Sequence, residues 1–245
     1  MDKSEYQQMY TLESSFWWYR VLHELVDWAL RKNKPSGEIS ILDAGCGTGR
    51  MMEICQSYGR VSGIDFSPDA IYFAHERGLN NIALGDLNDY KFENDHYDVV
   101  VCLDVLYHSA IQNDLAVVEK FYHTLKDKGL LIINLPAFDY LKRPHDRVVH
   151  TKKRYRRIAF EKDLKQIGFT ILHSSYRMPL LYFIILIAKL LRSKSKTDES
   201  ESDLKKLPSW LNTLLLNYGR LENGCIKLGI VFPVGSSLFV VAKKR

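Results

Sequence analysis

The sequence is poor in cysteine, and its cysteines form no recognisable metal site or disulfide framework. None stands in a C-x-x-C pair or at a zinc-like spacing from histidine: they are Cys46, Cys55, Cys102 and Cys225. We therefore expect reduced thiols and chemistry without a metal ion. Residues 1–15 are polar and lack the apolar core of a signal peptide, so we expect a cytoplasmic protein.

The sequence also lacks an apolar run of the roughly 20 residues that cross a bilayer. The longest run, residues 178–191, is shorter and contains Lys189; Arg192, Lys194 and Lys196 follow it. Three interpretations stay open. Residues 178–196 lie in the interface of an anionic membrane, peripheral on its inner face, or residues 178–191 cover a substrate pocket, or they form a buried helix.

Composition excludes a mainly disordered chain, because 46% of the 245 residues are hydrophobic and 26% are charged. The net charge is +5, and positive charge is concentrated in KKRYRR at 152–157 and in the lysines of 189–206. Such patches favour phosphate or anionic lipid as a partner. No separate basic recognition module is visible, so we expect no nucleic-acid partner.

Short apolar runs alternate with helical patterns along most of the chain. Runs such as ISILDA, YDVVVCLDVL and KGLLIINL are rich in Val, Ile and Leu, and segments of helical period separate them. This alternation predicts an α/β protein with a doubly wound parallel sheet covered on both faces. We expect the sheet in residues 37–176 and 236–245, a helical lid in 1–36, and a helical insertion in 177–235.

Two further helices are predicted outside the sheet. Residues 15–33 carry apolar residues at helical spacing, and Pro35-Ser36-Gly37 ends the pattern. Pro208-Ser209 opens a second helix. Its apolar face is expected to consist of Trp210, Leu211, Leu214, Leu215, Tyr218 and Leu221.

The stretch SILDAGCGTGR, residues 40–50, puts a carboxylate at the end of a predicted strand and three glycines directly after it. Without Cβ atoms, such a turn lets a ligand approach the backbone. The dinucleotide fingerprint is G-x-G-x-x-G, but Arg50 stands where its third glycine would fall. The glycine spacing therefore argues against a dinucleotide.

Charge at the strand ends points the same way. Four predicted strands end in a carboxylate: Asp43, Asp65, Asp86 and Asp104. A ring of four carboxylates would repel a pyrophosphate. It suits a ligand with positive charge, ribose hydroxyls and no phosphate, and S-adenosylmethionine has these properties.

Five motifs in order resemble those of the class I S-adenosylmethionine-dependent methyltransferases: LDAGCGTGR, GIDFSPDAI, GDLNDY, YDVVVCLDVLYH and KGLLIINLP. The resemblance covers residues 40–175 and the closing strand. It implies a Rossmann-like sheet of seven strands, the last antiparallel, with S-adenosylmethionine as cofactor. It assigns cofactor contacts to Asp43, Gly45, Cys46, Gly47, Gly49, Asp65, Phe66, Asp86, Leu87, Leu103 and Asp104.

The implied roles differ along this set. The three glycines would form the floor under the methionine part, and Asp43 would hold its ammonium or an ordering water. Asp65 would accept hydrogen bonds from both ribose hydroxyls. Asp86, Leu87 and Phe66 would contact the adenine.

Transfer of a methyl group needs an aligned nucleophile, exclusion of water and, for a neutral nucleophile, a base. Histidine titrates near neutrality, so His108, His145 and His150 are candidate bases. Tyr107 is a candidate catalytic residue that orients the nucleophile. A packing or hydrogen-bonding role remains open for each of them.

Candidate substrate contacts lie in two segments, ESSFWWYR near the N-terminus and HDRVVHTKKRYRR at 145–157. Both are similar to segments of a bacterial branch of the family whose members act on small molecules or on envelope-sugar and lipid intermediates, although Lys153 replaces the branch's first arginine. The candidates are Trp17, Trp18, Tyr19, Arg20, Arg154 and Tyr155.

We therefore expect methyl transfer to an oxygen or nitrogen of a small or lipid-linked molecule. A nucleic-acid methyltransferase and a non-catalytic, cofactor-binding or membrane-surface protein remain alternatives.

Overall fold

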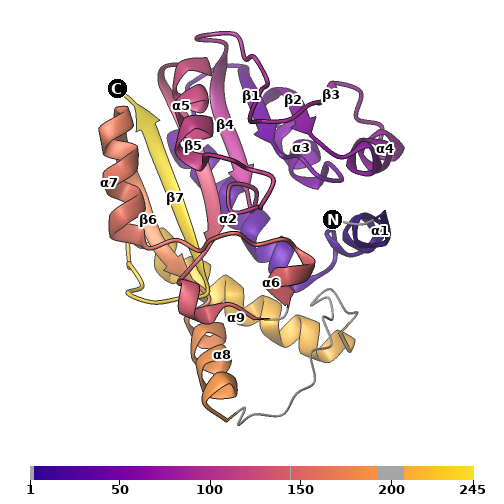
Figure 1. The fold of residues 1–245 in the computed structure, drawn as a ribbon, viewed down its shortest axis with the longest axis vertical. Helices are drawn as coiled ribbons and strands as arrows, with labels where there is room; N and C mark the ends of the chain where they lie inside the picture. The colour runs from indigo at the N-terminus through magenta and orange to yellow at the C-terminus, as the bar shows by residue number, and fades with distance from the viewer. Residues whose placement is uncertain (1–2, 144, 192–206) are drawn as a thin grey trace.

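The computed structural model describes residues 3–143, 145–191 and 207–245 (Figure 1). One seven-stranded sheet runs through it in the order β3-β2-β1-β4-β5-β7-β6. Six strands are parallel, and β7 is antiparallel to both neighbours, which confirms the predicted fold. The strands are β1 (Ile39–Ala44), β2 (Gly59–Asp65), β3 (Ile82–Leu84), β4 (Tyr97–Leu103), β5 (Leu125–Pro136), β6 (Phe169–Arg177) and β7 (Ser237–Lys244).

Helices cover both faces of the sheet, and a 3-10 turn, η1 (Asp139–Leu141), follows β5. The described helices are α1 (Lys3–Leu12), α2 (Trp17–Asn33), α3 (Arg50–Cys55), α4 (Pro68–Glu76), α5 (Asp114–Thr124), α6 (His145–Val148), α7 (Arg157–Ile167), α8 (Pro179–Leu191) and α9 (Ser209–Lys227). One apolar layer packs α2 and α3 on the sheet, and the opposite layer packs α5 and α7. This is the doubly wound arrangement that continuous apolar strands require.

Helix α2 is a core helix as well as part of the predicted lid. Its inner row includes Leu22, Leu25, Val26 and Ala29, each at most 2% exposed. This row packs against alternate side chains of β1, β4 and β5. The first two turns of α2, from its aromatic start to Leu22 and His23, line the ligand pocket.

Helix α9 lies along α2, although the two are far apart in sequence. Gly219 permits the close approach, because a Cβ there would lie 2.6 Å from a methyl of Val21. Asn212 accepts a hydrogen bond from the backbone N–H of Trp17 at 2.9 Å, and Asn223 donates to the carbonyl of Val21 at 2.8 Å. The lid and the insertion therefore form one packed unit.

The expected apolar face of α9 is only partly correct. The row that packs on α2 contains Leu216, Gly219, Asn223 and Ile226. By contrast, several members of the expected face are more than half exposed: Trp210, Leu214 and Leu221. The prediction erred because Gly219 and Asn223, which do not look like core residues, provide the contact with α2.

Residues 178–191 form α8, and the expectation of a buried helix is wrong. Ile185 is buried, but most of the helix surface is not. Leu181 and Ile185 line the principal pocket, as expected for a pocket cover. No helix among the described residues is long and apolar enough to cross a membrane.

Helix α1 lies within the helical lid predicted for residues 1–36, although the sequence analysis identified no separate helix at Lys3–Leu12. It packs on α4, where Tyr6 contacts Ala70 and Phe73 and the rings of Tyr10 and Phe73 stack at 5.2 Å. Because α4 follows β2, this contact brings α1 over the carboxyl end of the sheet. The N-terminal segment thereby becomes one wall of the site.

Candidate functional site

A cavity of about 500 Å³ opens at the carboxyl ends of β1, β2 and β4. Its lower part is lined by the glycine turn and the strand-end acids, and its upper part by α2, α8 and the segment after β5. The predicted cofactor residues found there are Asp43, Gly45, Cys46, Gly47, Asp65, Phe66, Asp86, Leu87, Leu103 and Asp104. All four acids of the expected ring thus face one cavity.

The glycine turn forms a backbone cradle. Gly45 has φ +81, and a Cβ there would lie 2.2 Å from Val105 Cγ2, so no larger residue fits. Gly47 has φ +53 and lies beneath Met9 of α1. Gly49 is outside the cavity: it precedes α3 with φ +87 and lets the chain pass Leu79. It serves packing of α3, whereas the sequence had placed it in the cofactor floor.

Asp43 carries the strongest indication of a cationic ligand. Its carboxyl is 2% exposed, and its Oδ2 has no hydrogen-bond partner among the described residues. Burial, reinforced by Glu13 and Asp65, raises the pKa of Asp43 to about 8. An ammonium or sulfonium in the cavity would compensate this buried charge, which fits S-adenosylmethionine.

Asp65, at the end of β2, is held in a fixed orientation. Its Oδ2 accepts from the N–H of Gly47 at 2.9 Å, and its Oδ1 accepts from the N–H of Ser67 at 3.0 Å. Burial raises the pKa of Asp65, and these N–H groups oppose the rise. The remaining lone pairs are placed to accept hydroxyl donors.

The third strand ends in a shallower part of the cavity. Asp86 is exposed and accepts from the N–H of Asn88 at 2.9 Å, while Leu87 is buried. Phe66 is 48% exposed, and its ring centroid lies 5.7 Å from that of His108. A flat apolar group could lie between Leu87 and Phe66, as expected for adenine.

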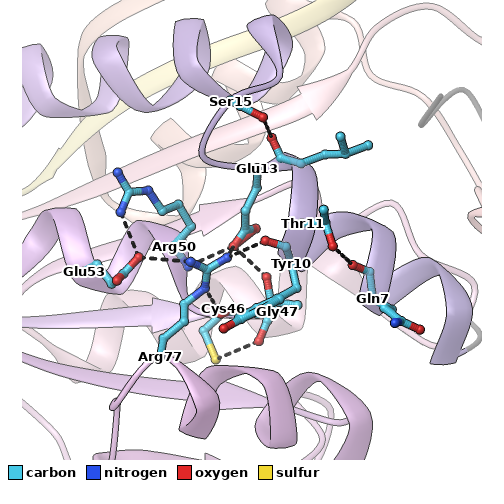
Figure 2. A network of polar contacts seen from close by, with 12 residues as sticks. Gln7, Tyr10, Thr11, Glu13, Ser15, Cys46, Gly47, Arg50, Glu53 and Arg77 are labelled. Atoms are coloured by element: carbon cyan, nitrogen blue, oxygen red, sulfur yellow. Dashed lines mark hydrogen bonds and ion pairs between the residues drawn. The ribbon is translucent and has the colours of Figure 1, made fainter. Parts of the chain in front are cut away.

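Figure 2 shows how the N-terminal segment is fastened to the glycine turn. Glu13 is 4% exposed; it accepts from Thr48 Oγ1 at 2.6 Å and from the N–H of Arg50 at 3.2 Å. Arg77 donates to Glu13 at 3.0 Å, to the carbonyl of Thr48 at 2.7 Å and to that of Tyr10 at 3.0 Å. We call this set the Glu13–Arg77 clasp. Sequence reasoning missed it because the partners are 64 positions apart.

The other end of the cavity is aromatic. Trp17, Trp18 and Tyr19 line it from α2, and Tyr107 lines it from the turn after β4. Burial raises the pKa of Tyr107, so this hydroxyl stays neutral. Arg20, predicted alongside them, does not line the cavity.

The three candidate histidines are not equivalent. His108 lines the cavity; its Nδ1 accepts from the N–H of Ala110 at 3.1 Å, and burial lowers its pKa to about 4. His150 is exposed and lies behind His108, with ring centroids 5.5 Å apart. The side chain of His145 lies outside the described residues.

The segment after β5 is held in place by a buried ion pair. Arg154 donates from Nε and Nη2 to the two carboxylate oxygens of Asp146 at 2.8 and 2.9 Å, and from Nη1 to the carbonyl of Ala137 at 3.2 Å. Arg154 lines the cavity, but these bonds use three of its five N–H donors and hold the guanidinium in place. Tyr155 is buried outside the cavity, with its hydroxyl 2.9 Å from Asp114. Both residues position the segment.

Asp104 differs from the other acids because it ends a polar chain that crosses the core. Asn134 Nδ2 donates to both of its oxygens at 3.0 Å, and Arg177, which is fully buried, donates to Asn134 Oδ1 at 3.0 Å. Burial raises the pKa of Asp104 to about 7, against the opposing effects of Asn134, Arg177 and Arg154. The sequence placed Asp104 among the cofactor contacts, but these bonds also suit a group that exchanges a proton.

Comparison with known proteins agrees with this geometry. Residues 42–133 match the family described as a methyltransferase domain. The tRNA U34 carboxymethyltransferase of Helicobacter pylori is 30% identical over 146 residues, which is 54% of this chain and 53% of that protein. The Helicobacter acinonychis enzyme of the same name gives the same values. The chain thus spans about half the length of these curated relatives.

Solved structures share the fold at low sequence identity. A chain from the complex of the Haloferax volcanii Trm112 methyltransferase activator with a methyltransferase has TM-score 0.61 and 15% identity, covering 98% of this chain and 93% of that one. An S-adenosylmethionine-dependent methyltransferase from Mesorhizobium loti has TM-score 0.57 and 17% identity, covering 88% and 96%. Haemonchus contortus phosphoethanolamine N-methyltransferase 2, solved with S-adenosylmethionine, has TM-score 0.58 and 19% identity, covering 90% and 52%. Residues 42–133 therefore match a methyltransferase domain, and the chain has the Rossmann-like fold that these methyltransferase structures share.

Proposed function

We propose that this protein transfers a methyl group from S-adenosylmethionine to an oxygen or nitrogen of a small or lipid-linked acceptor. The observation that carries the proposal is the unpartnered, buried Oδ2 of Asp43 beside the Gly45–Gly47 cradle. A buried anion without a partner is costly unless a cation joins it. When bound, S-adenosylmethionine supplies that cation and an activated methyl group.

The residues that line the cavity would bind the cofactor, exclude water and orient the acceptor. Asp43 and Asp65 hold the polar parts of the cofactor, and Leu87 with Phe66 receive its ring. Trp17, Trp18, Tyr19 and Tyr107 line the aromatic end of the cavity, which we call the aromatic chamber. Aromatic side chains there would exclude water and favour a positively charged group. This arrangement orients an acceptor toward the cradle, which is the main requirement of a direct displacement.

Asp104 is a better candidate for the proton acceptor than His108. A general base works best with a pKa near the working pH. The pKa of Asp104 is about 7, whereas that of His108 is about 4. We assign proton removal from the acceptor to Asp104, with His108 and Tyr107 orienting the acceptor.

A tRNA is the second candidate acceptor, because the curated relatives are named for carboxymethyl transfer to U34 of tRNA. Basic side chains beside the cavity suit either a tRNA phosphate or an anionic lipid. They belong to the segment 139–157 and include Lys142, Lys152, Lys153 and Arg156. Both candidates need the same cofactor site. They differ in the acceptor and, if the transferred group is carboxymethyl as in the names of these relatives, in the donor as well, because the methyl of S-adenosylmethionine cannot supply a carboxymethyl group.

Calorimetric titration with S-adenosylmethionine and with its demethylated product tests the cofactor half of the proposal. Asp65→Ala should weaken binding by about 1.5–3 kcal/mol, the range for a hydrogen bond to a charged group. Asp89→Ala removes a nearby exposed acid that does not line the cavity and serves as the matched control. No binding by the unaltered protein would place the non-catalytic alternative first.

Radiolabelled methyl transfer tests the acceptor. The purified protein is incubated with labelled S-adenosylmethionine and either a bacterial lipid extract or bulk tRNA. Label in the lipid fraction supports the lipid-linked acceptor, and label in tRNA alone overturns it in favour of the second candidate. An Asp104→Asn sample in each incubation distinguishes enzymatic transfer from adventitious labelling.

A further inference from the structure

Helix α8 has two apolar faces, and the described residues pack against only one of them. Leu181 and Ile185 point into the cavity wall. The opposite side carries large apolar residues that are between 45% and 78% exposed: Leu180, Phe183, Ile184, Ile187, Leu190 and Leu191. Their spacing of three, four and seven positions forms one continuous row. Figure 1 shows α8 projecting from the body of the molecule below α9.

Helix α9 adds a second exposed row. Trp210, Leu214 and Leu221 are 69%, 58% and 71% exposed. At 100° per residue they lie on the side of α9 opposite to Gly219 and Asn223, which pack on α2. Both helices therefore direct apolar rows away from the sheet. We call the two rows together the apolar surface.

Exposed apolar side chains gathered in this way on a protein surface indicate a binding surface. We propose that the apolar surface rests in the interfacial layer of an anionic membrane and that the cavity behind α8 receives an acceptor anchored in that layer. The second half of this statement rests on the proposed function; the first half does not. The acceptor class is thereby narrowed to lipid-linked molecules.

The composition of α8 favours a membrane over a protein partner. Between Pro179 and Ala188 the only polar side-chain atom is the hydroxyl of Tyr182, so a protein partner would find almost no hydrogen bonds there. The helix is too short to cross a bilayer but suits one lying in its interface. An exposed tryptophan such as Trp210 is a typical residue of that interface.

Positive charge lies next to this surface. Lys189 of α8 donates to the carbonyl of Tyr140 at 2.7 Å, and the hydroxyls of Tyr140 and Tyr182 lie 3.0 Å apart. These contacts fix Tyr140, near the start of the basic segment, against α8. Within this segment Lys142 and Lys153 pair with Asp139 and Asp114, whereas Lys152 donates to the carbonyls of Ile111 and Gln112. An apolar row beside basic residues that are not neutralised in this way is complementary to anionic headgroups.

Because α8 also lines the cavity, the apolar surface and the proposed reaction are connected. In this arrangement one side of α8 is embedded in the membrane, and the other side lines the cavity with Leu181 and Ile185. The cavity then lies beside the acyl chains of the lipids. A lipid-linked acceptor would then reach the aromatic chamber without leaving the membrane. The same geometry would not assist a freely diffusing metabolite.

Co-sedimentation of the full chain with vesicles tests the inference. Vesicles of phosphatidylcholine with 30% phosphatidylglycerol, on the order used for anionic surfaces, are compared with pure phosphatidylcholine. We expect the protein to pellet with the anionic vesicles only. The double variant Ile184→Glu/Ile187→Glu should lose at least about tenfold in vesicle binding, because charges replace two aliphatic side chains that the membrane would bury. Ile158→Glu, at a 77% exposed isoleucine of α7, is the matched control and should pellet like the unaltered protein.

Titration of every variant with S-adenosylmethionine separates the two proposals. Unchanged cofactor binding with loss of pelleting confined to the α8 variant supports the membrane surface. Cofactor binding without pelleting overturns the membrane inference and leaves the proposed function standing. Pelleting without cofactor binding overturns the proposed function and leaves the membrane inference standing. Equal pelleting with pure phosphatidylcholine overturns the choice of an anionic surface. A dimer in sedimentation that Ile184→Glu/Ile187→Glu dissociates, with no pelleting, assigns the surface to a second copy of the chain.

Discussion

The Glu13–Arg77 clasp should control whether the N-terminal segment stays on the cofactor site, and Arg77→Met tests this. The Arg77 side chain is 9% exposed and that of Glu13 is 5% exposed, so the change leaves a buried carboxylate without its cation. Breaking a buried pair from one side costs about 3–5 kcal/mol. Arg77 also loses its bonds to the carbonyls of Thr48 and Tyr10 and its position 4.4 Å above the Tyr10 ring.

The expected result is a lower free energy of unfolding, by about 3–5 kcal/mol in a urea titration. Glu13→Gln should cost less, because the amide oxygen still accepts from Thr48 and the N–H of Arg50 while the desolvated charge disappears. In the double variant the two effects should not add, since both act on one contact. Both single variants should also weaken S-adenosylmethionine binding, because Tyr6, Met9 and Glu13 line the cavity.

The pH dependence of stability provides an independent test of the clasp. Burial raises the pKa of Glu13 in the folded protein, so protonation of this group favours folding and its ionisation disfavours it as pH rises through the folded-state pKa. Arg77 opposes that rise. The stability difference between the unaltered protein and Arg77→Met should therefore shrink as pH falls and Glu13 becomes neutral. An Arg77→Met protein with unchanged stability at neutral pH would refute the reasoning.

Three further predictions concern the cavity. Gly45→Ala should abolish cofactor binding in calorimetry, because its Cβ would lie 2.2 Å from Val105 Cγ2, and adding Val105→Ala should restore part of the binding. Unchanged binding by Gly45→Ala would contradict the role of Gly45 in the cofactor cradle. Since the pKa of Asp43 is about 8, binding of a cation below that pH should release a proton, seen as a binding enthalpy that depends on the buffer and is lost in Asp43→Asn. Turnover should rise with pH through the pKa of Asp104, about 7, and Asp104→Asn should lower kcat while leaving cofactor affinity intact; a persisting rise would exclude Asp104 as the base.

The sequence could predict the sheet and the strand-end acids because both depend on local signals. Continuous apolar strands between helical patterns identify a parallel sheet, and parallel strands bring Asp43, Asp65 and Asp104 to one edge. The glycine turn could also be predicted from local sequence, except for Gly49, whose role depends on Leu79 in another part of the chain.

The remaining parts depend on contacts between distant segments. Helix α1 has few apolar residues and acquires its place through α4, and the close packing of α9 on α2 uses Gly219 and Asn223 instead of a leucine row. Likewise, the chain of hydrogen bonds from Asp104 through Asn134 to Arg177 joins the residue after β4 to β5 and β6. No periodicity in the sequence marks such contacts.

The position of β7 has a consequence for folding. It lies between β5 and β6, and its register pairs Ile132 with Val241 and Tyr176 with Leu238. Until Ser237–Lys244 is available, β5 therefore presents an open edge of unpaired backbone groups, and β6 has no neighbour in the described sheet. Assembly of the sheet must wait for a pairing between segments more than a hundred positions apart, which predicts slow folding and a period of exposure to aggregation.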